Sequence, residues 1–82
     1  MSETLAERIQ KAMDERGVTQ ADLARMTGMT TSNMAYIVNG KTKDPRLSSV
    51  MLIAEALGVS LNYLAGYVPY SVVKLEDGED EG

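Results

Sequence analysis

The stretch TQADLARMTGMTTSNMAYIVNG, residues 19–40, holds two short apolar patterns separated by a glycine. In the first pattern, Leu23 and Ala24 share one side of a helix, and Gly28 follows as a residue suited to the left-handed conformation after a helix end. The second pattern also has helical spacing and consists of Met34, Ile37 and Val38. The stretch therefore predicts two short helices joined by a tight link.

Small polar residues indicate where these helices begin and end. Thr19 and Thr30 each precede a pattern, and a threonine there caps a helix by accepting a hydrogen bond from a backbone N–H. Gly40 follows the second helix, and Pro45 keeps the residue before it out of helical geometry. We therefore expect the second helix to end near Asn39 and a loop to follow it.

Three further helices are expected around this pair. The first lies within residues 2–17, with Ser2 or Thr4 as the cap and Gly17 after its end, and the others run from 47 or 48 to 57 and over 61–65 after the cap Ser60. The apolar residues at helical spacing in them are Leu5, Ile9, Ala12 or Met13, Val50, Ile53, Ala54, Leu57 and Leu64. No stretch before Tyr70 has the pattern of a strand, so the sequence predicts an all-α domain of five helices.

The composition limits which classes of protein this chain can belong to. The 82 residues suit one domain, and 44% apolar residues are enough for a folded core. No apolar run reaches the roughly 18–20 residues of a membrane span and no signal-peptide pattern is present, which predicts a cytoplasmic protein without a membrane partner. With no Cys and no His, we expect neither an enzyme nor a metal site, a cofactor or a small-molecule substrate.

The net charge of −4 is distributed unevenly along the chain. Five acidic residues lie within residues 76–82, whereas residues 1–75 carry eight basic and seven acidic groups, a charge of +1. Residues 41–46 hold three basic residues and one acidic residue, a local charge of +2. This loop suits a phosphate backbone, although an ordinary solvated loop has the same composition.

The C-terminal segment differs in character from the rest. Pro69 breaks a helix, and residues 70–75 are β-prone. A strand at an interface and a poorly ordered tail both remain open, because a single strand has no partner in a helical body. The expected organisation is a helical domain over residues 1–67 and an extended or strand-like segment with an acidic tail over residues 68–82.

The order of the motifs over residues 5–66 resembles the Cro/cI-type helix-turn-helix family, that of lambdoid phage repressors and Cro proteins. The segments that carry the resemblance are Thr19-Gln20, NGKTKDPRL at 39–47 and IAEALGVSLNYLAG at 53–66. It implies a compact lambda-repressor-like domain whose third helix lies in the major groove of double-stranded DNA.

The resemblance also implies roles for individual residues. The base-reading positions on the third helix are Thr31, Ser32, Asn33, Ala35 and Tyr36. The phosphate-contacting positions are Thr19, Gln20, Asn39, Lys41, Thr42, Lys43 and Arg46. Hydroxyl and amide groups suit base edges, and basic side chains suit phosphate, although solvated first-turn residues remain the alternative for Thr31 and Ser32. Because the third helix carries no Arg or Lys to bind guanine, we expect an A·T-leaning site.

The same resemblance implies a homodimer, because one reading helix covers only a few base pairs and relatives bind two-fold sites as dimers. It implies an interface at the fifth helix and just after it, formed by Leu61, Tyr63, Tyr67 and Val68. For Tyr63, packing onto its own core is the alternative.

Together these features predict a sequence-specific, double-stranded-DNA-binding transcriptional regulator of the phage or prophage repressor or Cro-like kind. It would act as a dimer on a two-fold operator. An antitoxin with the same DNA-binding fold and a protein-interaction adaptor are the alternatives. The operator, the regulated genes, the sign of regulation and whether the chain is part of a longer repressor stay open.

Overall fold

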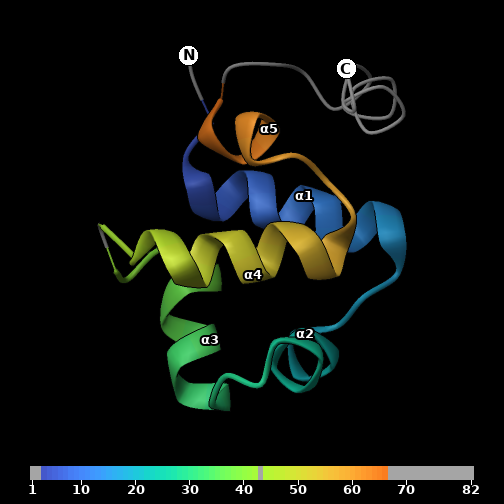
Figure 1. Cartoon of the computed structure of the whole chain (residues 1–82), viewed down its shortest axis with the longest axis vertical. Helices are drawn as coiled ribbons and strands as arrows, with labels where there is room; N and C mark the ends of the chain where they lie inside the picture. Colours follow the sequence, from blue (N-terminus) through green and yellow to red (C-terminus); the bar gives the residue numbers. More distant parts are fainter. Residues whose placement is uncertain (1–2, 43, 67–82) are drawn as a thin grey trace.

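The computed structural model describes residues 3–42 and 44–66, which form five helices and no strand. The helices are α1 (Leu5–Arg16), α2 (Gln20–Thr27), α3 (Thr31–Val38), α4 (Leu47–Leu57) and α5 (Leu61–Ala65) (Figure 1). The all-α, five-helix prediction is therefore confirmed. None of the described helices is long and apolar enough to cross a bilayer. The segment predicted to be extended or strand-like, residues 68–82, lies outside the described residues.

One hydrophobic core joins all five helices. In Figure 1, α4 crosses the middle of the molecule, with α2 and α3 on one side of it and α5 on the other. α4 packs against α1, α2 and α5, and α1 also packs against α3 and α5. The core contains the predicted inward residues, except that Leu5 is only partly buried. It also contains two residues that periodicity did not predict, Val59 and Tyr63.

Side-chain caps begin four of the five helices. The oxygens of Thr4, Thr19, Thr30 and Ser60 each accept a hydrogen bond from the backbone N–H three residues later, at 3.0–3.1 Å. In α1 and α2 the carboxylates of Glu7 and Asp22 accept a bond from the N–H of the cap residue in return. The caps predicted from the sequence are thus confirmed, with Thr4 as the cap of α1.

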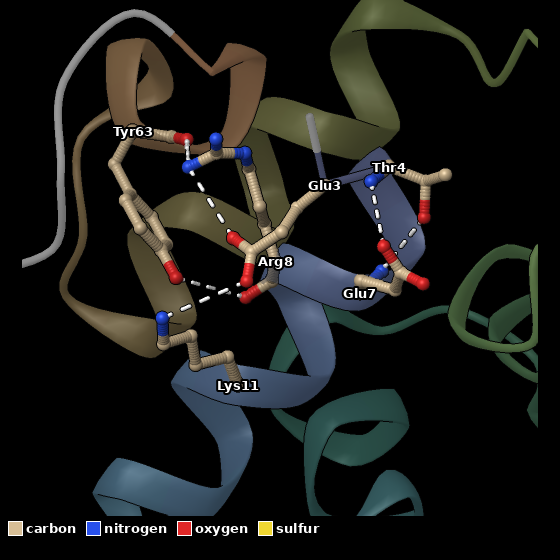
Figure 2. Close-up of polar contacts among 6 residues, drawn as sticks. All are labelled: Glu3, Thr4, Glu7, Arg8, Lys11 and Tyr63. Atoms are coloured by element: carbon tan, nitrogen blue, oxygen red, sulfur yellow. Dashed lines mark hydrogen bonds and ion pairs between the residues drawn. The ribbon is translucent and has the colours of Figure 1, made fainter. Parts of the chain in front are cut away.

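Tyr63 and Arg8 join α5 to α1 (Figure 2). The Tyr63 side chain is 1% exposed, and its hydroxyl donates to the Arg8 carbonyl oxygen at 3.4 Å. The Arg8 guanidinium lies over the Tyr63 ring, 5.4 Å from the ring centroid, and donates to the Tyr63 carbonyl oxygen at 3.4 Å. The Tyr63 ring therefore fills the core of its own chain, which is the alternative to an interface position that the sequence left open.

We expect Tyr63→Ala to lower the free energy of unfolding by about 3–5 kcal/mol, because it removes a buried ring and leaves a cavity. Tyr36→Ala is the matched control: Tyr36 is 57% exposed on α3, so the same substitution there should change stability by less than about 0.5 kcal/mol. Urea unfolding followed by circular dichroism measures both variants.

If Tyr63→Ala does not fold, Tyr63→Phe provides the second measurement, since it removes only the hydroxyl bond and should cost about 1 kcal/mol. Equal losses of stability in the two alanine variants would contradict the placement of Tyr63 in the core.

The capping box of α2 makes stability depend on pH. The backbone N–H of Thr19, and then the side chain of Arg25, donate hydrogen bonds to the Asp22 carboxylate and lower its pKa below the ordinary value. A lowered pKa in the folded state means that the stabilising contribution is complete above about pH 4, the ordinary aspartate pKa. That contribution is lost as the pH falls through the lower folded pKa.

We therefore expect Asp22→Asn to destabilise the domain near neutral pH and to have a steadily smaller effect in acid, below about pH 4. Urea unfolding of the two proteins across this pH range measures the difference. Asp14→Asn is the control, because the Asp14 side chain makes no hydrogen bond or ion pair with other described residues. A difference between Asp22→Asn and the unsubstituted chain that stays constant with pH would rule out this origin.

Candidate nucleic-acid interface

The link between α2 and α3 is closed by hydrogen bonds at the end of α2. The backbone N–H groups of Gly28 and Met29 both donate to the carbonyl oxygen of Ala24, at 2.9 and 3.1 Å. The Thr27 hydroxyl donates to the Leu23 carbonyl at 2.8 Å and accepts from the Met29 N–H at 3.3 Å. Gly28 has φ +77°, a conformation that glycine adopts without strain. These bonds hold the link between α2 and α3, and the tight link that the sequence predicted is confirmed.

α3 has one buried and one exposed side. Met34, Ile37 and Val38 lie in the core with at most 5% of each residue exposed. The polar face of α3, defined by Thr31, Ser32, Asn33 and Tyr36, is exposed to solvent, and none of these four side chains hydrogen-bonds another described residue. Ala35, the fifth predicted base-reading residue, is half-buried beside them. The structure therefore leaves the hydroxyl and amide groups of this face available to a ligand.

The C-terminal end of α3 is fixed by contacts from two directions. The side-chain amide of Gln10, on α1, donates to the Val38 carbonyl oxygen. The backbone N–H groups of Lys41 and Thr42 donate to the Tyr36 carbonyl at 2.9 and 3.3 Å. Sequence reasoning missed Gln10, because its contact joins residues 28 positions apart and no local pattern predicts it.

The N-terminus of α2 holds two of the predicted phosphate-contacting residues. Thr19 is exposed and Gln20 is half-buried. The Thr19 hydroxyl oxygen and backbone N–H are both engaged with Asp22, which in turn pairs with Arg25 at 2.9 Å. Gln20 is therefore the side chain at this helix end that is better placed to reach an anion, where backbone N–H groups and the helix dipole favour negative charge.

The loop after α3 adjoins the polar face of that helix. Asn39, Lys41 and Arg46 are exposed and Thr42 is half-buried, whereas Lys43 lies outside the described residues. A groove between α3 and the start of α4 is lined in part by Asn33, Thr42 and Arg46. The structure thus brings one predicted base-reading residue together with two predicted phosphate-contacting residues on a single surface.

The predicted dimer residues are placed only in part. Leu61 is half-buried at the start of α5, where it packs against the edge of the core. Tyr67 and Val68 lie outside the described residues. With Tyr63 in the core, Leu61 is the one member of the predicted set that the described structure leaves accessible at α5.

Comparisons with known proteins identify the same kind of domain. A family model for the Cro/C1-type HTH DNA-binding domain matches residues 8–69. The HTH-type transcriptional regulators for conjugative element SXT of Vibrio cholerae and conjugative element pMERPH of Shewanella putrefaciens are each 39% identical over 80 residues, 94% of this chain and 36% of the relative. The HTH-type transcriptional repressor RghR of Bacillus subtilis is 32% identical over 69 residues, 80% of this chain and 51% of the relative.

The chain therefore spans between about one third and one half of the length of these relatives. The family match covers α2, the link, α3 and the loop after it, together with α4 and α5. These are the elements that carry the polar face of α3 and its flanking groups. The chain belongs to the Cro/C1-type helix-turn-helix family of DNA-binding domains.

Proposed function

We propose that this chain binds double-stranded DNA sequence-specifically and regulates transcription, with α3 in the major groove. The observation that carries the proposal is the polar face of α3, which presents unbonded donors and acceptors while the opposite side of the helix is fixed in the core. A rigid element with outward polar groups is what the reading of base edges requires. The relatives, which are named as transcriptional regulators, support the regulatory role.

The residue types on α3 suit A·T base pairs. Asn33 can form two hydrogen bonds with adenine, and the methyl group of Thr31 can pack against the thymine methyl. Ser32 donates or accepts, and Tyr36 adds contact area and one hydroxyl one turn further along. With no Arg or Lys on α3, the proposed site lacks the usual bidentate contact to guanine.

Phosphate contacts are assigned to the groups on either side of α3. Gln20 lies at the N-terminus of α2, and Asn39, Lys41 and Thr42 follow α3, with Arg46 at the start of α4. These groups fix the register of the protein on the duplex without reading sequence. No cofactor, metal, small-molecule substrate or catalytic activity enters this proposal.

A homodimer on a two-fold operator completes the proposal, because a single α3 reads too few base pairs to select a site in a genome. Two reading helices spaced by about 34 Å would contact successive major grooves on one side of the duplex. Two of the relatives are named for conjugative elements, which favours a regulator of a mobile element. The proposal also includes a regulator of a phage or prophage.

Selection from random duplex DNA at near-physiological salt should enrich a two-fold symmetric, A·T-leaning motif. Thr31→Ala and Tyr36→Ala should each cost about 1–3 kcal/mol of discrimination at the bases that they face, because they remove base contacts from a folded domain. Sequencing of the selected pools measures motif and spacing together. Absence of any motif from the folded chain would exclude operator reading, and guanines enriched opposite α3 would exclude the A·T preference.

Lys41→Ala should act differently from the α3 variants. It should weaken binding to all duplexes by a similar factor and reduce the slope of log affinity against log salt by about 0.9, because it removes one phosphate contact. Lys11→Ala on α1, outside the predicted DNA-contacting set, is the matched control and should leave the slope unchanged. Titration of one duplex at several salt concentrations gives both slopes. Equal slopes for Lys41→Ala and Lys11→Ala would remove Lys41 from the interface.

A further inference from the structure

The outward side of α4 carries apolar residues that neither the core nor the proposed DNA contacts use. Leu47, Met51 and Leu52 are 64%, 52% and 42% exposed. The residues that fix α4 in the core lie on its other side and are Val50, Ile53, Ala54 and Leu57. Scattered apolar side chains are ordinary on a surface, but neighbouring ones on successive turns of one helix form a patch that favours an interaction site.

A groove lies beside Met51 and Leu52 of this patch, between α4 and the start of α5. Its lining includes Ser48, Met51, Leu52 and Glu55 from α4, and Leu61 from α5. We call these five residues the α4 face. Residues 48, 51, 52 and 55 have the spacing i, i+3, i+4 and i+7, so they form one continuous strip along the helix.

We infer that a second copy of this chain occupies the α4 face, with its own α4 antiparallel to the first across a two-fold axis. The inference rests on the proposed function, because a two-fold operator requires a two-fold protein. It specifies where the two protomers meet: α4 is the centre of the interface, and Leu61 is its edge.

The order of polar and apolar residues on the strip is complementary to itself when reversed. Ser48 at one end offers a hydroxyl donor, Glu55 at the other end offers a carboxylate acceptor, and Met51 and Leu52 lie between them. A two-fold axis between positions 51 and 52 places Ser48 against Glu55 of the partner subunit and Met51 against Leu52 of the partner subunit. A self-complementary strip is what an isologous interface requires.

The side chains at both ends of the strip are available for such pairing. Within residues 3–42 and 44–66, the side chains of Ser48 and Glu55 make no hydrogen bond or ion pair. In the antiparallel arrangement the carboxylate would gain a charge-assisted bond while Met51 and Leu52 become buried. A parallel arrangement would instead bring the two Glu55 carboxylates together, which repel each other.

The position of α3 fits this axis. α3 lies on one side of α4, and α5 lies on the other (Figure 1). A two-fold axis that runs along the α4 face from the α5 side to the α3 side reverses the direction of α4. The same rotation keeps both α3 helices on one side of the dimer, as a two-fold operator requires.

Sedimentation of the full chain over a concentration series, without DNA, tests the interface directly. We expect a monomer–dimer equilibrium whose dissociation constant rises roughly 30-fold in Met51→Lys, because the variant places a charge at the centre of the interface. Met26→Lys is the matched control: Met26 is 53% exposed on α2, so the same change there should leave the equilibrium unaltered. A chain that stays monomeric, or an equal response of the two variants, would overturn the inference.

Substitutions at Ser48 test the antiparallel pairing. Ser48→Lys should tighten the dimer by attraction to Glu55 of the partner subunit, and Ser48→Glu should weaken it by repulsion. Glu55→Lys added to Ser48→Glu should restore the dimer, since the pair then has opposite charges. Changes of the same sign for Ser48→Lys and Ser48→Glu, or no restoration in the double variant, would rule out this register.

The two proposals can fail separately. If the chain selects a two-fold motif but its dimer does not respond to the Met51 and Ser48 substitutions, the DNA-binding proposal stands and the α4 face is not the interface. A dimer that responds as expected, from a chain that selects no motif, would keep the interface and exclude operator reading.

Discussion

The burial of Met34, Ile37 and Val38 is the contact on which the rest of the structure depends. α3 has only eight residues, and helices shorter than about 12–15 residues are marginal on their own in water. Packing against α1 and α2 therefore supplies the stability that length does not. The Thr30 cap and the Gln10 amide hold the two ends of α3, so the polar face keeps one orientation.

α3 and α4 are packed in the same way but carry different residue types on their outer sides. Both bury one apolar side in the common core and leave the other side to solvent. The outer side of α3 carries hydroxyl and amide groups, which suit hydrated base edges, whereas that of α4 carries Leu47, Met51 and Leu52, which suit another protein surface. Residue chemistry, rather than helix geometry, thus separates the proposed DNA face from the proposed dimer face.

The elements were predictable from sequence because their signals are local. Each predicted cap lies within three residues of the backbone N–H from which it accepts a hydrogen bond. The apolar spacing likewise indicated the inner sides of four helices. The sequence left the position of Tyr63 open because five-residue α5 is too short to show a period, and its bonds join it to Arg8, 55 positions away. The α4 face was not predicted for a related reason: the apolar spacing indicates which side of the helix is buried, but not what covers the apolar residues on the other side.

The charge of the domain gives the proposed dimer a further role. Residues 1–75 carry only +1, and Asp44 lines the same groove as Arg46, so non-specific attraction to phosphate is expected to be weak. A weakly charged protomer that reads a few base pairs has little affinity of its own. Pairing two protomers makes the second half-site contact intramolecular, which raises affinity only where both half-sites are present at the right spacing. In the proposed dimer, low charge would therefore make dimerisation the step that separates the operator from other DNA.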